Sequence, residues 1–245
     1  MMQEFALVLL LLLLPVLFFL ASRVRAGKTG DLRPLPGVEE LAGAVGRSAE
    51  TGQALHVSVG VAGVGGSQTA ETWAGLTLLS ELADEAAACN TPLIVTVADP
   101  TVLPLAQEIL WRAAVRNGNP EGYDPTQVRF IAPNPMAYAA GVTGLLLWEP
   151  LTANVMVGTF GEEVLLMGEV GARQGVRQVA GTANPQALPL MAATTDETLI
   201  GEEIFAGGAY TARQPIQVAS LLAQDWARWA IAVAIIVVAA AKMLL

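Results

Sequence analysis

Strand-like and helix-like segments alternate from residue 55 to residue 181, and this pattern restricts the fold more than any other feature of the sequence. Runs of apolar and β-branched residues predict strands at 55–61, 93–98, 128–132, 153–158 and 176–181. Apolar residues at helical spacing predict helices at 38–49, 69–89, 101–115, 136–147, 162–174 and 196–211. Such alternation favours an α/β fold with a mainly parallel sheet and helices on both faces.

Two of the predicted helices have unusual sequences. The helix at 136–147 is apolar on nearly every side and contains Gly141 and Gly144. It is expected to be either deeply buried or packed tightly against a neighbour, because small residues permit close approach within a fold or between subunits. The last helix, at 196–211, is expected to begin at a cap formed by Thr195 or Asp196.

Long apolar runs lie at both ends of the chain, at 5–21 and 229–245, and each approaches the roughly 17 to 25 residues that cross a bilayer as a helix. Basic residues follow the first run, which favours an uncleaved anchor with the N-terminus outside and the next segment in the cytoplasm. The predicted organisation is an N-terminal transmembrane anchor with its basic flank at 1–28, an α/β domain at 34–222 and a C-terminal transmembrane helix at 225–245.

The composition excludes several classes of function. The formal net charge is −9, and the two lysines, Lys28 and Lys242, flank the predicted spans. The acidic domain between them repels phosphate backbones, so nucleic acid is not an expected partner. With one histidine and one cysteine in the chain, we expect no metal site and no cofactor. Cys89 cannot form an intrachain disulfide and is expected to be a small buried side chain.

The glycine-rich stretch GVAGVGGSQTAE, residues 60–71, joins the predicted strand at 55–61 to the helix at 69–89. It matches neither G-x-G-x-x-G, since residue 68 is glutamine, nor a P-loop, since no lysine follows. Exposed amides at the start of that helix are still able to hold an anion, beside the end of the next strand. The candidate ligand-binding residues are Gly63, Gly65, Gly66, Ser67, Thr69 and Asp99. The alternative is a purely structural turn in which Ser67 or Thr69 caps the helix.

Ser67 also raises the possibility of covalent catalysis. The sequence GGS followed by TPLIVTVAD resembles membrane-bound, crotonase-fold serine peptidases, which activate serine with lysine or histidine. The 34–222 domain contains no lysine, and His56 lies near the start of the strand whose far end carries the glycines. The requirement for a general base is therefore unmet within one chain.

Carboxylates are the most numerous candidate ligands. The pairs at 162–163, 196–197 and 202–203, together with Glu169, would form a cation or acid/base cluster if the last helix packs beside the helix at 162–174. Glu202 and Glu203 are the strongest candidates because apolar residues surround them in LIGEEIF.

The segments NVMVGTFGEEVLLMGEVGARQG, TLIGEE and AQDWARW resemble an uncharacterised bacterial family of membrane-anchored α/β domains. The resemblance implies a place in the bacterial inner membrane, with the lipid bilayer as a partner, and it names no activity. It also directs attention to Thr182, Glu202 and Glu203, which lie in the phrases GTA and TLIGEE.

Three hypotheses for function follow from these features. The first is a membrane-anchored, non-enzymatic scaffold or subunit of a larger membrane complex, which associates with itself or with other membrane proteins. The second is a sensory module that binds a small molecule or an anion. The third, which the missing general base disfavours, is a crotonase-fold serine peptidase.

Overall fold

The computed structural model describes residues 35–211 without a gap, and elsewhere residues 15, 18–19, 21–25, 218–219, 222–223, 228–229, 232 and 235. The chain forms two compact units. One is Pro34–Gly207, and the other consists of the terminal segments Met1–Arg33 and Gly208–Leu245.

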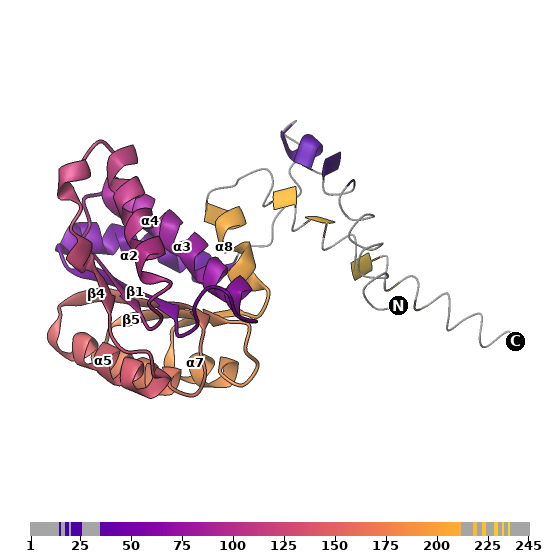
Figure 1. Ribbon diagram of the computed structural model, residues 1–245. Coiled ribbons are helices and arrows are strands. Elements are labelled where there is room, and N and C mark those ends of the chain that lie inside the picture. The colour runs from indigo at the N-terminus through magenta and orange to yellow at the C-terminus, as the bar shows by residue number, and fades with distance from the viewer. Residues whose placement is uncertain are drawn as a thin grey trace, which may run out of the picture. The chain divides into compact units, whose positions relative to one another are not determined.

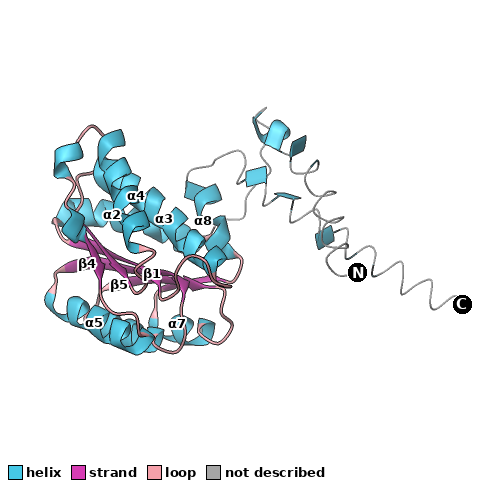
Figure 2. Ribbon diagram, viewed as in Figure 1, coloured by secondary structure: helices cyan, strands magenta, loops and turns pink. Residues whose placement is uncertain are grey.

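A six-stranded sheet forms the centre of the Pro34–Gly207 unit, with its strands in the order β3-β2-β1-β4-β5-β6 (Figure 2). The strands are β1 (Ala54–Gly60), β2 (Leu93–Val97), β3 (Val128–Phe130), β4 (Leu151–Thr159), β5 (Arg177–Thr182) and β6 (Glu197–Ile200). Every neighbouring pair is parallel, which confirms the predicted α/β fold.

Helices cover both faces of this sheet (Figure 1). One face carries α2 (Pro36–Thr51), α3 (Thr69–Ala88) and α4 (Leu103–Arg116), and the other carries α5 (Pro135–Trp148), α6 (Val164–Arg173) and α7 (Leu188–Thr194). Two short 3-10 turns, η1 (Pro120–Gly122) and η2 (Pro125–Gln127), lie between α4 and β3, and α8 (Glu203–Thr211) follows β6.

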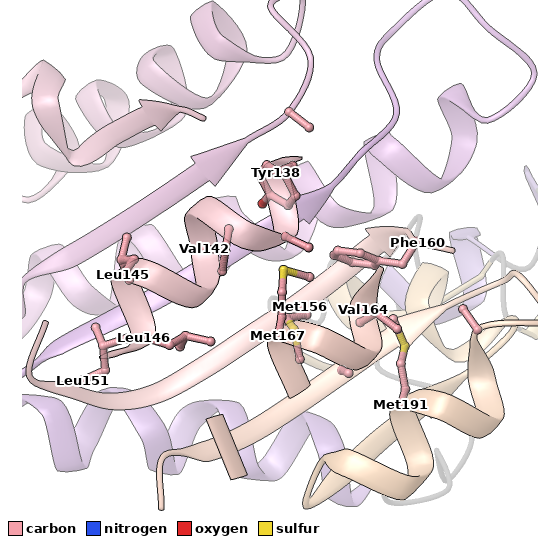
Figure 3. Packing of buried hydrophobic residues seen from close by; sticks show 14 of the residues in the cluster. Tyr138, Val142, Leu145, Leu146, Leu151, Met156, Phe160, Val164, Met167 and Met191 are labelled. Atoms are coloured by element: carbon pink, nitrogen blue, oxygen red, sulfur yellow. The ribbon is translucent and has the colours of Figure 1, made fainter. Parts of the chain in front are cut away.

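The core on the α5–α7 face is built from large side chains that are at most 1 % exposed (Figure 3). These side chains are Tyr138, Met156, Phe160, Val164, Met167 and Met191. They come from α5, β4, the residue after β4, α6 and α7, so the apolar residues of these helices bury one continuous layer against the sheet.

The predicted helix at 196–211 is wrong in its first part. The structure instead has α7, which was not expected, followed by the edge strand β6, and α8 begins only at Glu203. Asp196 Oδ2 accepts a hydrogen bond from the backbone N–H of Gln178 at 2.7 Å, which aligns β6 with β5. Gly201, with φ of +58°, then ends the strand. Pairing with β5, a non-local interaction, therefore overrides the local resemblance to a helix cap.

Two expectations about burial also change. Cys89 is exposed, because it is the C-cap residue that follows α3 and lies at a surface turn. The helix α5 is buried along one side only: Tyr138 and Val142 are fully buried, whereas Met136 and Trp148 are 56 % and 86 % exposed. The helix therefore packs against the sheet and α6 on one side, whereas its other side is not covered by any described residue of the chain.

In the terminal unit, Ala21 and Val24 pack against Val218, Ala219 and Ala223. No helix among the described residues has the length and hydropathy of a membrane span. The predicted spans at 5–21 and 229–245 lie almost wholly outside the described residues.

Candidate functional site

The carboxyl ends of β1 and β4 lie side by side at the centre of the sheet, where the strand order reverses. From β1 the chain continues to β2 and β3 on one side, and from β4 to β5 and β6 on the other. Open α/β sheets bind ligands beyond the carboxyl ends of the strands at such a point. We call the last residues of the strands, the segments that follow them and the first residues of the next helices the carboxyl edge. It includes every residue predicted for a site: Gly63, Gly65, Gly66, Ser67, Thr69, Asp99, Thr182, Glu202 and Glu203.

The carboxyl group of Asp99 lies directly against the glycine-rich turn, because a Cβ at Gly63 would be 2.4 Å from Asp99 Cγ. Asp99 Oδ1 accepts hydrogen bonds from the backbone N–H and the hydroxyl of Thr101, at 2.8 and 2.5 Å. Thr101 Oγ1 in turn accepts a hydrogen bond from the N–H of Val64 at 3.0 Å. Asp99 therefore fixes the conformation of the turn through Thr101.

Thr69 stabilises the other half of the turn. Its Oγ1 accepts a hydrogen bond from the N–H of Gly65 at 2.9 Å and donates one to the carbonyl oxygen of Gly66 at 2.6 Å. The N-cap of α3 is Gln68, with no side-chain capping bond, so the predicted cap at Ser67 or Thr69 is wrong. The amides of Val64 and Gly65 are thus occupied by side chains of the protein itself and are not offered to an anion.

The end of β4 and the segment after it contribute Thr159, which sequence reasoning missed, and Glu163, which it placed in the carboxylate cluster. Thr159 is 4 % exposed, and its hydroxyl has no hydrogen-bond partner among the described residues. Glu163 is 6 % exposed and accepts a hydrogen bond from the N–H of Gly161 at 2.7 Å. Thr159 is the register partner of Gly60 in β1, so the orphaned hydroxyl belongs to a residue at the point where the strand order reverses.

The predicted carboxylate cluster does not form among the described residues. Thr182 lies beside Glu71 of α3, with a 3.4 Å hydrogen bond to its carboxylate, while Glu203 accepts the N–H of Ile200 at 2.9 Å. Glu169 pairs with Arg173 on the surface of α6. The carboxylates remain separate because β6 replaces the first turns of the expected helix, and α6 packs against α5 and α7.

Charge is distributed unequally between the two ends of the strands. The arginines described between residues 35 and 211 all lie toward the amino-terminal end, in the last two turns of helices or the first two residues of strands: Arg47, Arg112, Arg116, Arg129, Arg173 and Arg177. The carboxyl edge carries acidic side chains, among them Asp99, Glu162 and Glu163. Such an edge repels anions, so a neutral or cationic ligand fits it better than a phosphate does.

A chain of buried polar side chains crosses the sheet beneath α5 and α6, and its hydrogen atoms can be assigned from one end. Gln178 Nε2 donates to the carbonyl oxygens of Gly168 and Thr194, at 2.8 and 2.9 Å, so Gln178 Oε1 accepts from Asn154 Nδ2 at 2.8 Å. The remaining oxygen of Asn154 then faces His56 Nδ1 at 2.7 Å. The imidazole therefore carries its proton on Nδ1.

This row of hydrogen-bonded side chains continues from His56 Nε2, the other ring nitrogen, to α5. His56 Nε2 accepts from the hydroxyl of Thr96 at 2.9 Å, and Thr96 Oγ1 lies 2.7 Å from the hydroxyl of Tyr138. Ser58 Oγ is 2.5 Å from the same hydroxyl. Burial lowers the pKa of His56 to about 4 and raises the pKa of Tyr138 to about 12, so both side chains are neutral at pH 7.

Because His56 belongs to this row of buried polar side chains, it does not act as a general base for Ser67. His56 is fully buried and both of its nitrogens are engaged, whereas Ser67 is on an exposed turn. The sequence does indicate these buried polar side chains, because four strands each contain a polar residue within an apolar run: His56, Thr96, Asn154 and Gln178. What the sequence did not show was their register, which aligns His56 with Asn154 and Asn154 with Gln178.

The comparisons with known proteins bear on family and on nothing further. No curated protein and no solved structure gave a significant match to the chain. One family model, described as a domain of unknown function (DUF6754), matches residues 1–245. The resemblance implied an uncharacterised family, and this part of it is confirmed: because the match extends over all of those residues, the chain belongs to the DUF6754 family, whose function is unknown.

Proposed function

We propose that the protein is a membrane-anchored, non-enzymatic scaffold, or a subunit of a larger membrane complex, whose α/β domain associates with a second copy through α5. The observation that supports self-association is the outer face of α5, which is apolar, uncharged and exposed. This outer face consists of Met136, Ala137, Ala140, Gly144, Leu147 and Trp148.

The spacing of these residues places them along one side of the helix, opposite the buried Tyr138 and Val142. Large side chains lie at its two ends: Met136 is 56 % exposed at one, and Trp148 is 86 % exposed at the other. Between them the surface is made of small residues, and a Cβ added at Gly144 would meet no atom within 4 Å. A face of this shape permits close approach of a second helix.

A second copy of the chain is the partner that the charge distribution favours. The net charge of −9 makes two copies repel each other over most of their surfaces. The sequence of α5, from Pro135 to Trp148, contains no charged residue. Two copies that meet along α5 about a twofold axis place no like charges opposite each other, since each presents the same neutral face.

Placement in a membrane is supported by the sequence alone. The apolar runs at 5–21 and 229–245, with basic residues after the first, favour two spans that hold the domain on the cytoplasmic side of a bacterial inner membrane. Labelling in intact cells of a cysteine placed at Asn119, in the loop after α4, tests the side. Protection from a membrane-impermeant reagent is expected, and labelling without permeabilisation would contradict the cytoplasmic placement.

Self-association is tested by the mass of the full chain extracted from its membrane and by disulfide crosslinking. In a Cys89→Ser background, Ala140→Cys should give a disulfide-linked dimer on mild oxidation. Ala140→Glu should lower the mass to that of a monomer, because it buries two like charges opposite each other. Ala88→Glu, on the exposed end of α3, is the matched control and should leave the mass unchanged. A monomeric wild-type chain that does not crosslink in membranes would refute the proposal.

Small-molecule sensing at the carboxyl edge is the second candidate function. It is supported by the contact of Asp99 with the glycine-rich turn, which follows β1 at the point where the strand order reverses. A thermal-shift screen of neutral and cationic metabolites, with nucleotides and simple anions included, should give a hit that Gly66→Val abolishes. Gly66 is the better test position than Gly65, whose φ of +109° would strain any side chain. A hit that Gly66→Val leaves unchanged, or no hit, would make the turn structural.

A further inference from the structure

The terminal unit has small side chains inside and large ones outside. The buried side chains described in it are each at most 8 % exposed: Ala21, Val24, Val218, Ala219 and Ala223. The large apolar side chains at its surface are each at least 62 % exposed: Phe18, Phe19, Trp229 and Ile235. A domain in water buries its large apolar side chains, as the α5–α7 face of the sheet does. The arrangement in the terminal unit is typical of helices in lipid, where small residues permit close packing and the acyl chains solvate large apolar side chains.

The buried contact in this unit joins the two ends of the chain, and we call it the terminal contact. Ala21 and Val24 come from a helical segment, 21–25, where the predicted span at 5–21 ends. Val218, Ala219 and Ala223 are helical residues that precede the predicted span at 229–245. In a helix, the spacing of Ala219 and Ala223 places both on one side, and small residues four positions apart permit a second helix to approach closely.

Exposed arginines lie near the terminal contact in both segments. Arg23 and Arg25 follow the first predicted span, and Arg228 directly precedes the second. The guanidinium of Arg23 lies 5.9 Å from the centre of the Phe19 ring, four residues back toward the span. Arginines that reach back along a helix, and tryptophans such as Trp229, are typical of the boundary between hydrocarbon and headgroups.

We propose that the two predicted spans of one chain enter the bilayer side by side and are held together at its cytoplasmic surface by the terminal contact. The partner of the N-terminal span is therefore the C-terminal span of the same chain. The exposed side chains of Phe18, Phe19, Trp229 and Ile235 face lipid. This inference rests on the proposed membrane anchoring and adds the arrangement of the two anchors.

Burial within one chain argues against a second copy at the terminal contact. Ala219 is fully buried and Ala223 is 4 % exposed, in both cases by residues of the same chain. A helix from a second copy would find little of this small-residue surface left to contact. The connection of both segments to one domain also raises their effective concentration, which favours pairing within a chain over pairing between copies.

Disulfide crosslinking of the full chain in its own membrane tests this arrangement. In a Cys89→Ser background, Ala21→Cys combined with Ala219→Cys or with Ala223→Cys should form a disulfide within one chain on mild oxidation. A protease site inserted in the loop at 117–119 identifies this product, because the two halves of the cut chain stay joined until the disulfide is reduced.

The control for the crosslink is Ser22→Cys, which places the thiol at an exposed neighbour of Ala21. Combined with Ala219→Cys, it should give little or no disulfide. A disulfide between two copies, no disulfide within a chain from either pair, or equal crosslinking from Ser22→Cys would overturn the proposal.

A larger side chain tests the role of the small residues. Ala219→Leu should lower the yield of the disulfide between Ala21→Cys and Ala223→Cys several-fold, because it moves the two helices apart. Ala232→Leu, at an exposed position of the second segment, is the matched control and should leave the yield unchanged. An unchanged yield in Ala219→Leu would also overturn the proposal.

Spin labels in proteoliposomes test the contact with lipid. Labels at Phe18→Cys and Ile235→Cys should collide with oxygen and be protected from a water-soluble nickel complex, whereas a label at Asn119→Cys should collide with nickel. Free access of nickel to the first two labels would contradict the lipid-facing surface. Extraction of membranes at high pH tests the anchoring itself: release of the chain would refute the proposed function, whereas a retained chain without the internal disulfide would refute only the pairing of its spans.

Discussion

Acidification should destabilise the α/β domain through His56 before most of its carboxylates are protonated. The side chain is fully buried and neutral, and burial lowers its pKa from the ordinary 6.5 to about 4. An unfolded chain therefore binds a proton at His56 between these two values while the folded chain does not. The stability that the neutral imidazole contributes is complete above about pH 6.5 and is lost as the pH falls toward 4.

The size of this effect follows from the two pKa values. Within that window, the free energy of unfolding should fall by about 1.4 kcal/mol for each pH unit, because one proton separates the two states. Between pH 7 and pH 5 the loss through His56 is about 2 kcal/mol, since the window opens only near 6.5. This loss is a large fraction of the roughly 5 to 15 kcal/mol that stabilises an ordinary domain.

The assay benefits from the fact that the chain contains a single histidine. A two-bond 1H–15N NMR spectrum of the imidazole reports both its titration and its tautomer without assignment of the rest of the protein. A tautomer with hydrogen on Nδ1 is expected at pH 7, as the contact with Asn154 requires. Denaturant unfolding at pH 7 and pH 5 measures the accompanying loss of stability. His56→Gln retains a donor and an acceptor and should remove about 2 kcal/mol of the pH dependence.

Two results would refute this account. A native pKa near 6.5 would show that the ring is not desolvated. A hydrogen on Nε2 would contradict the polar chain that begins at the carbonyl oxygens of Gly168 and Thr194. In the second case the assignment of donors through Asn154 would have to be reversed.

Two further predictions concern stability and are measured by denaturant unfolding at pH 7. Gly75→Ala should destabilise the domain by about 1–3 kcal/mol, because the new Cβ would lie 2.4 Å from the carbonyl oxygen of Val157. The control Gly66→Ala has open space around its Cβ and should change stability by less than about 0.5 kcal/mol. Equal effects of the two variants would mean that α3 does not approach β4 this closely. Asn134→Ala should cost about 1 kcal/mol, because the Asn134 side chain accepts hydrogen bonds from two backbone amides at the start of α5, and an unchanged stability would contradict this capping.

Sequence reasoning located the segments of the carboxyl edge but not their chemistry. The turn at 60–69 and Asp99 were recognisable because each follows an apolar strand, and the carboxyl ends of neighbouring parallel strands lie together. The hydrogen bond that occupies the amide of Val64 was not predictable, since its acceptor Thr101 lies far from it in the sequence.

The sequence by itself determined the α/β class, the parallel sheet and the position of most helices, because these depend on local hydrophobic periodicity and on turn residues. The tertiary structure decided what non-local contacts control. It made 197–200 an edge strand through pairing with β5, left one side of α5 exposed, and aligned four polar side chains into a buried chain through His56. Strand register and helix spacing bring together residues distant in sequence, and no local pattern encodes those distances.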